Sequence, residues 1–114
     1  MGKKETLVGT MCRHAKWRKD NAGKPDLTYL PYGSLADVAR VCHYGAEKYS
    51  RDNWRDGRAE SYVAAAMRHL HAWSDPEWSS RDVETGESHL AHAAASILFA
   101  IELERKSSEH DPEA

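Results

Sequence analysis

The most constraining feature of this chain is a stretch of 14 residues, Ser88 to Ile101, that contains no Asp, Glu, Lys or Arg. From Ala91 onward its side chains are apolar at nearly every position, so a helix formed here would be apolar on almost all of its faces. The stretch is too short to cross a membrane, and two histidines interrupt its N-terminal half. We therefore predict a helix over about residues 87–104 and expect it to be the central, most buried helix of one compact domain.

Two further segments repeat apolar residues at helical spacing. The first begins at Ser34, a favourable N-cap residue, and has Asp37 three residues later as a carboxylate form of the capping box. Its apolar stripe continues to Tyr49. The second segment covers about residues 60–73. The chain is therefore expected to form three substantial helices.

Polar, turn-forming residues separate these segments at 50–59 and 74–86. A fourth, short helix would lie either in the N-terminal segment or between residues 74 and 82. The expected fold is all-α: a helical bundle of three to four helices. Three helices of this length bury only a modest core, so we expect oligomerisation to complete the bundle.

The chain divides into three parts by composition. Residues 1–31 are basic, lack a steady apolar period and end in two prolines six residues apart, which predicts an extended N-terminal arm. Within it, residues 27–30 would pair as a short strand or lie against the helices as a covering arm. Residues 32–105 form the helical domain. Residues 106–114 have almost no apolar content and are expected to be disordered.

Composition excludes several classes of protein. With 16 Lys and Arg against 18 Asp and Glu, the net charge of −2 argues against binding to nucleic acid through bulk charge. Two cysteines, Cys12 and Cys42, form no disulfide framework, and no secretory signal opens the chain, so a cytoplasmic protein is expected. The phosphate-binding motif GxxxxGK[ST] is missing, and so are the motifs GxGxxG, GxSxG and HExxH.

A group of carboxylates and imidazoles surrounds the start of the predicted central helix. Asp82, Glu84 and Glu87 precede His89 and His92, which lie three residues apart on one helical face. Carboxylates followed by imidazoles one turn further on form the ligand arrangement that holds divalent cations in helical bundles. The alternative is that both histidines are hydrogen-bonded core or interface residues.

Two other groups of residues suit a nucleotide. On the 60–73 helix, His69 is expected to lie half inside, and Arg68 would grip a phosphate unless it is a solvated arginine near a helix C-terminus. Further candidates for base stacking, base-edge recognition and phosphate binding are Lys48, Tyr49, Asn53 and Trp54. In the competing interpretation, the two aromatic rings of this second group close the core and its lysine is solvated.

These pieces, in this order, resemble a known family over about residues 23–104. The most specific parts are Tyr44-Gly-Ala-Glu-Lys-Tyr49 followed by Asn53-Trp54, and Asp82-Val-Glu-Thr-Gly86 followed by His89-Leu-Ala-His-Ala93. The chain resembles the bacteriophage and prophage dATP/dGTP diphosphohydrolase-like proteins, which are grouped with the all-α (MazG-like) nucleoside triphosphate pyrophosphohydrolases.

The resemblance implies a helical domain that oligomerises, a Mg²⁺ or Mn²⁺ site and a purine deoxynucleotide as substrate. Cleavage between the α- and β-phosphates would release a nucleoside monophosphate and pyrophosphate. The better-known relatives carry an ExxE motif on one helix and an ExxD motif on the next. Here Glu84 and Glu87 have ExxE spacing but no ExxD partner, so the metal ligands must differ.

By position, the resemblance implies a metal centre near Asp82, Glu84, His89 and His92, with His69 alongside. In the mechanism expected from it, three carboxylates, those of Asp82, Glu84 and Glu87, hold the ion, and the imidazoles of His89 and His92 bind or orient it. A carboxylate or His69 takes the proton of the attacking water.

The remaining candidates bind the substrate in this mechanism. Arg68 and Lys48 bind the phosphates, and Tyr49, Asn53 and Trp54 hold the base. As the catalytic carboxylate, Glu84 is expected to be indispensable, so Glu84→Gln would abolish turnover and leave the fold intact.

Two other classes of function remain open at this stage. A non-catalytic nucleotide-binding protein, a phage sponge, would bind the nucleotide in the same pocket without forming product. A helical scaffold protein, whose histidines are only structural, would respond to neither nucleotide nor EDTA.

Overall fold

The computed structural model describes residues 22–109, with side chains through residue 107, and within this range the regular elements are all helices, with no strand. The elements are the 3₁₀ turn η2 (Leu27–Tyr29), α2 (Tyr32–Lys48), the 3₁₀ turn η3 (Asn53–Asp56), α3 (Ala59–Ser74) and α4 (His89–Glu109). The all-α prediction is confirmed, with three long helices as expected. The two short helices lie in the arm and in the 50–59 segment, whereas residues 74–82 contain none.

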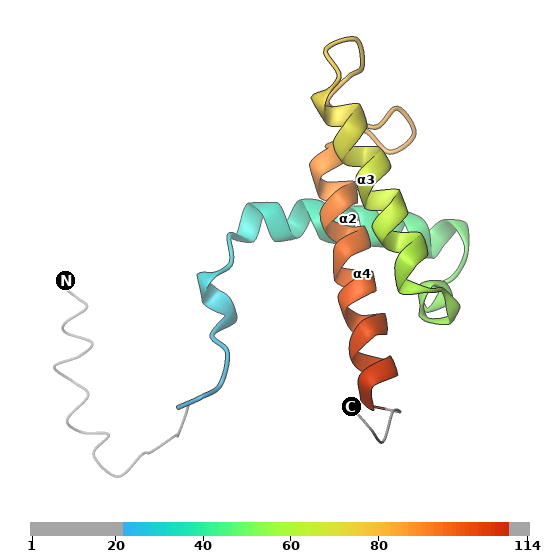
Figure 1. Ribbon diagram of the computed structural model, residues 1–114. Helices are drawn as coiled ribbons and strands as arrows, with labels where there is room; N and C mark the ends of the chain where they lie inside the picture. Colours follow the sequence, from blue (N-terminus) through green and yellow to red (C-terminus); the bar gives the residue numbers. More distant parts are fainter. Residues whose placement is uncertain (1–21, 110–114) are drawn as a thin grey trace, which may run out of the picture.

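Helices α3 and α4 run side by side in opposite directions, and α2 crosses behind them (Figure 1). The antiparallel order is clear from two pairs of rings: Tyr62 near the start of α3 contacts Phe99, and His69 near its end contacts His89. The connection between α3 and α4, residues 75–88, therefore lies at one end of this helix pair.

The seam between the helices is built from small side chains. Six alanines are buried: Ala66 and Ala72 on α3, with Ala91, Ala93, Ala95 and Ala100 on α4. Alanine lets two helix backbones approach closely, so the helices pack without large interlocking side chains. As expected, α4 holds most of the buried residues.

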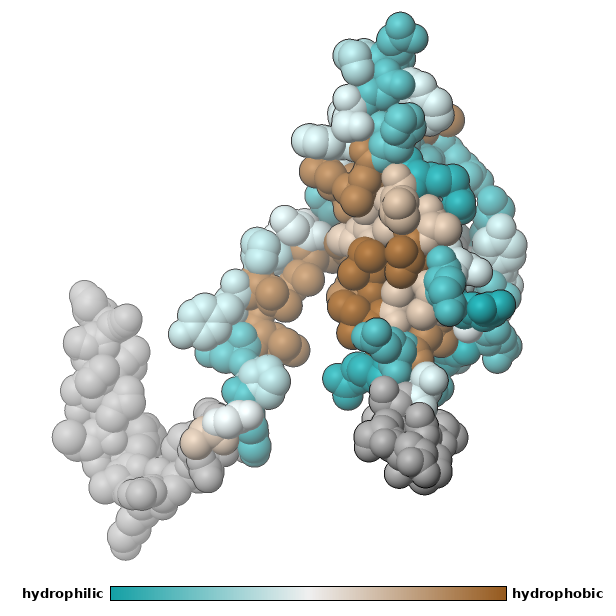
Figure 2. All heavy atoms as spheres, in the orientation of Figure 1, coloured by the Kyte–Doolittle hydropathy of each residue, from teal (hydrophilic) through white to brown (hydrophobic). Residues whose placement is uncertain are grey.

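Larger apolar side chains of α4 remain exposed. Ile97, Leu98 and Ile101 are 40–50% exposed in the single chain, and apolar side chains gather in the middle of the visible face of the α3–α4 pair, with hydrophilic ones around them (Figure 2). The expected oligomer, which would cover this surface, stays a prediction. None of the helices in residues 22–109 combines the length and apolar character needed to cross a bilayer.

Helix boundaries differ from those expected at α2 and α4. Helix α2 begins two residues before the expected Ser34 cap, with Pro31 at the cap position and no side-chain cap. Proline suits this place because its φ is fixed and the first helical N–H groups have no partner within the helix. Asp37 pairs with Arg40 rather than capping the helix.

The expected boundaries of α4 were wrong at both ends. It starts at His89, two residues late, because the preceding turn holds residues 87 and 88. It continues to Glu109, so residues 106–109 are helical and not the disordered tail that was expected. Glu102 and Lys106 have the i, i+4 spacing that favours extension of a helix already formed. Residues 110–114 lie outside the described residues.

The described part of the arm, residues 22–31, contains a turn at Gly23 and the turn η2. Asp26 caps η2 by accepting a hydrogen bond from the Thr28 N–H at 3.0 Å. The short strand considered for residues 27–30 does not form. Residues 1–21 lie outside the described residues, so most of the expected arm is untested.

Candidate metal centre

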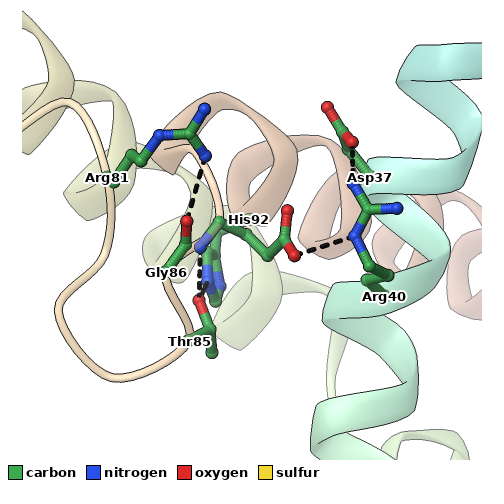
Figure 3. A network of polar contacts seen from close by, with 7 residues as sticks. Asp37, Arg40, Arg81, Thr85, Gly86 and His92 are labelled. Carbon is green, nitrogen blue, oxygen red and sulfur yellow. Dashed lines mark hydrogen bonds and ion pairs between the residues drawn. The ribbon is translucent and has the colours of Figure 1, made fainter.

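The turn before α4 places the central carboxylate of the site. Asp82 Oδ1 accepts hydrogen bonds from the backbone N–H groups of Glu84, at 2.8 Å, and Thr85, at 3.0 Å. Gly86 donates its N–H to the Asp82 carbonyl at 2.8 Å and has a φ of +78°, a conformation that favours glycine. Arg81 donates to the Gly86 carbonyl at 3.0 Å (Figure 3). The turn thus orients Asp82 through its own backbone.

Three side chains from different elements converge beside this turn. One ligand atom each from His69, Asp82 and His89 lies within 4.8 Å of the other two, and no other group of this kind occurs among the side chains that the structure describes, those of residues 22–107. The two Nδ1 atoms of the histidines are 3.0 Å apart, and His89 is only 7% exposed. We call these three residues the ligand triad.

A third imidazole supports the triad from one side. His92 stacks on His69 with ring centroids 4.5 Å apart and planes inclined by 18°. Its Nε2 lies 2.7 Å from the Thr85 hydroxyl oxygen, which also accepts the Glu87 N–H at 3.1 Å (Figure 3). We call His69, His89 and His92 the histidine cluster. The hydrogen bond with Thr85 and the stacking on His69 therefore hold the ring of His92 in place.

Burial favours the uncharged form of two of these imidazoles, those of His69 and His92. Desolvation, together with the neighbouring imidazoles, lowers the pKa of His69, and desolvation also lowers the pKa of His92 despite the nearby carboxylate of Asp82. Desolvation acts to raise the pKa of Asp82, but two backbone N–H bonds and the imidazoles outweigh it, so the pKa is lowered. Neutral imidazoles beside an ionised carboxylate are in the protonation states that bind a metal.

Two of the predicted ligands point elsewhere. Glu84 accepts hydrogen bonds from the Tyr44 hydroxyl at 2.8 Å and from Lys48 at 3.0 Å. Glu87 accepts from Arg40 Nε at 2.9 Å (Figure 3). The crossing helix α2 supplies all three donors, so both glutamates tie the turn to α2, and their oxygens do not join the triad.

The predicted base-binding residues lie near the other end of the helix pair. Trp54 stacks on Phe99, with centroids 4.5 Å apart and planes inclined by 11°, and Tyr62 meets Phe99 edge-on at 5.4 Å. We call these three rings the apolar aromatic cluster. Phe99 is ten residues, about 15 Å, along α4 from His89. The guanidinium of Arg55 also lies over the Trp54 ring, which favours the core interpretation of this indole.

The other candidates for substrate binding are divided between the two ends. Tyr49 and Asn53 border a small cavity of about 160 Å³ beside the apolar aromatic cluster. Lys48 reaches the turn through Glu84, and Arg68 lies next to His69 on α3. Sequence reasoning assigned no role to Thr85 or Trp78. An aromatic residue in an otherwise polar loop was the only available signal for Trp78.

Comparison with known proteins identifies the family. A sequence profile described as "dATP/dGTP diphosphohydrolase, N-terminal" matches residues 14–113. The chain therefore belongs to this family, and the resemblance seen in its sequence is confirmed.

A relative named dATP/dGTP diphosphohydrolase, from Salmonella phage PMBT28, is 35% identical over 81 residues. The alignment covers 71% of this chain but only 27% of the relative, so the chain spans about a quarter of that protein's length. No solved structure matches the chain.

Proposed function

We propose that this chain binds a divalent metal ion at the ligand triad and hydrolyses purine deoxynucleoside triphosphates to the monophosphate and pyrophosphate. One observation carries the proposal: His69, Asp82 and His89 converge in a chain of the dATP/dGTP diphosphohydrolase family. The name of the phage relative supports the substrate and the bond that is cleaved.

The donor set suits a first-row transition metal. Two imidazole nitrogens and one carboxylate oxygen fit Mn²⁺ better than Mg²⁺, which prefers oxygen ligands throughout. A bound ion would acidify a water molecule and neutralise charge on the phosphates. Three protein ligands leave coordination positions for that water and for the substrate. We therefore expect Mn²⁺ to support more activity than Mg²⁺.

The chain's own residues have distinct tasks in this proposal. Arg68 binds phosphate oxygens, because its guanidinium is always charged and makes no ion pair with the described side chains of residues 22–107. His92 is outside the triad and its pKa is lowered, so as a neutral imidazole it accepts the proton of the attacking water. The sequence had suggested a carboxylate or His69 for this step, but in this proposal His69 is a ligand.

We also propose that a second copy of the chain covers the exposed face of α4. Ile97, Leu98 and Ile101 form one stripe, and no large side chain is fully buried among the described residues. Covering such a stripe by self-association removes apolar surface from water. Leu98→Glu should reduce the mass of the particle measured by analytical ultracentrifugation, and an unchanged mass would contradict this proposal.

A product assay tests the proposed reaction. The protein is incubated with each dNTP and NTP in the presence of Mn²⁺, Mg²⁺, Fe²⁺, Zn²⁺ or EDTA, and products are separated by ion-exchange chromatography. We expect dAMP or dGMP with pyrophosphate, and no product in EDTA. His69→Gln should be inactive, whereas His43→Gln, a matched change of a histidine on α2 away from the triad, should be active.

The same assay, together with a measurement of nucleotide binding, distinguishes the alternative functions. Intact nucleotide with tight binding would replace the enzyme with a nucleotide-binding protein. If the protein neither binds nucleotide nor forms product, the helical scaffold is the function that remains.

A further inference from the structure

A cavity of about 470 Å³ opens beside the ligand triad. All three triad residues line it, and Met67, Arg68 and Trp78 are among its other walls. Its volume is in the range of sites that bind small molecules. One cavity thus joins a candidate metal centre to a cationic and an aromatic side chain.

The loop after α3 presents Trp78 at this cavity. The Trp78 N–H donates to the Asp75 carbonyl at 3.0 Å, and the Glu77 N–H donates to Asp75 Oδ1 at 2.9 Å. These bonds fix the turn that carries the indole, although the side chain itself is 58% exposed. A single exposed aromatic residue is ordinary on a protein surface. What distinguishes Trp78 is its place on the wall that also carries the triad.

The contrast with Trp54 narrows the choice of a stacking residue. Trp54 already has Phe99 and Arg55 over its ring. Among the side chains described for residues 22–107, neither an aromatic ring nor a cation stacks on the Trp78 indole. The ring of Trp78 is therefore available to a ligand.

A nucleotide has an anionic end and an aromatic end, and the cavity has a wall that suits each of them. Phosphates would lie at a metal ion held by the triad and at Arg68, because both cations attract anionic oxygens. The base then extends toward the apolar wall, where a ring can stack on an exposed indole. Stacking is stronger for the larger ring system of a purine than for a pyrimidine.

From this arrangement, and resting on the proposed function, we propose that Trp78 stacks on the purine base of the substrate in this cavity. Trp78 is then a specificity-determining residue for the reaction at the triad. It replaces Trp54 as the platform for the base.

Two probes separate binding of the base from binding of the phosphates. The first is α,β-methylene dATP, which is not cleaved between its α- and β-phosphates. The second is inorganic triphosphate, which has no base. Affinities of the intact protein are measured by calorimetry with Mn²⁺ present. Trp78→Ala should weaken binding of the first probe about 10- to 100-fold, the loss expected for one stacked base. Binding of inorganic triphosphate should stay within about twofold of the wild type.

Two control variants sharpen the test. Trp78→Phe retains an aromatic face and should bind the dATP analogue within a few-fold of wild type. Trp73→Ala removes a half-exposed tryptophan that does not line the cavity and should leave both affinities unchanged. In turnover assays, Trp78→Ala should raise KM and change kcat little.

Three results would overturn the inference. If Trp78→Ala binds the dATP analogue as wild type does, the base lies elsewhere, and the hydrolase proposal stands on its own assay. If both probes weaken equally, Trp78 supports the loop and does not stack on the base. If the wild type binds neither probe, the proposed function itself fails, and this inference fails with it.

Discussion

A group of packed rings lies toward each end of the α3–α4 pair, and the two groups differ in chemistry. In the apolar aromatic cluster, Trp54, Tyr62 and Phe99 pack where α3 begins. In the histidine cluster, three imidazoles pack where α3 ends. The same antiparallel helix pair supplies all of these rings except that of Trp54, which lies on η3, and the distances between ring centroids are similar in the two clusters.

The difference lies in what packing achieves at each end. Burial of phenyl and indole rings stabilises the fold directly. Burial of imidazoles lowers the pKa of His69 and His92 and leaves nitrogen lone pairs beside the Asp82 carboxylate. Ring packing thus stabilises the fold at one end of the helix pair, and the other end carries a candidate metal centre. Substitutions at the two ends should therefore affect different measurements.

The largest effect is expected from Asp82→Asn. Asparagine keeps an oxygen that can accept the Glu84 and Thr85 N–H groups, so the turn should survive. The negative charge at the triad is lost, and we expect turnover to fall about 10³-fold, which corresponds to about 4 kcal/mol. The free energy of unfolding measured without metal should change little. Full activity in this variant would remove Asp82 from the site.

Phe99→Ala should produce the opposite pattern. Phe99 contacts both other rings of its cluster but is only half-buried, so we expect the free energy of unfolding to fall by about 2–3 kcal/mol. Metal affinity and activity per folded molecule should be retained at low temperature. Urea denaturation gives the first quantity and calorimetry with Mn²⁺ the second. Phe99→Leu, which keeps most of the buried volume, should show a smaller loss.

Gly57 provides a second way to perturb the apolar end. A Cβ atom at this position would lie 2.9 Å from a ring carbon of Tyr62 and 3.2 Å from the Trp54 carbonyl oxygen. Gly57→Ala should therefore shift the ring of Tyr62 and lower stability by about 1–3 kcal/mol, as overpacking does. Thermal unfolding measures the effect, and an unchanged melting temperature would show that the ring adjusts without loss.

Acid should weaken the histidine end selectively. The pKa values of His69 and His92 in the folded protein lie below the ordinary 6.5. Below about pH 6.5 the unfolded chain therefore binds more protons than the folded one, and stability falls as the pH falls toward the lowered pKa values. Melting temperatures in EDTA should drop over this window. His92→Gln should flatten the pH dependence, and an equal drop in that variant would contradict the assignment.

Glu84→Gln should have the smallest effect. Sequence alone favoured Glu84 as a ligand and a catalytic group, but in the structure it accepts hydrogen bonds from Tyr44 and Lys48. An exposed ion pair contributes little to stability and is screened by salt. We expect turnover within about tenfold of the wild type, measured with Mn²⁺. Complete loss of turnover, with metal binding also abolished, would return Glu84 to the ligand set.

Local patterns were sufficient to identify the three helices and to predict part of the candidate site. Spacing along the chain puts His89 and His92 on one helical face and Asp82 just before them, and it shows that residues 88–101 prefer a buried helix. Sequence motifs also identified the family. All of these features depend on residues close together in the chain, where helical periodicity determines which side chains are neighbours.

Contacts between distant segments depended on the tertiary structure. Antiparallel packing brings His69 of α3 against His89, 20 residues later. Trp54 instead lies in the apolar aromatic cluster, where it stacks on Phe99. The crossing of α2 supplies Arg40, Tyr44 and Lys48, which bind Glu87 and Glu84 outside the triad. Helical periodicity gives the face of each residue but not the partner of that face. The partner is decided by how helices of small side chains pack, and by which charges the crossing helix brings to the turn.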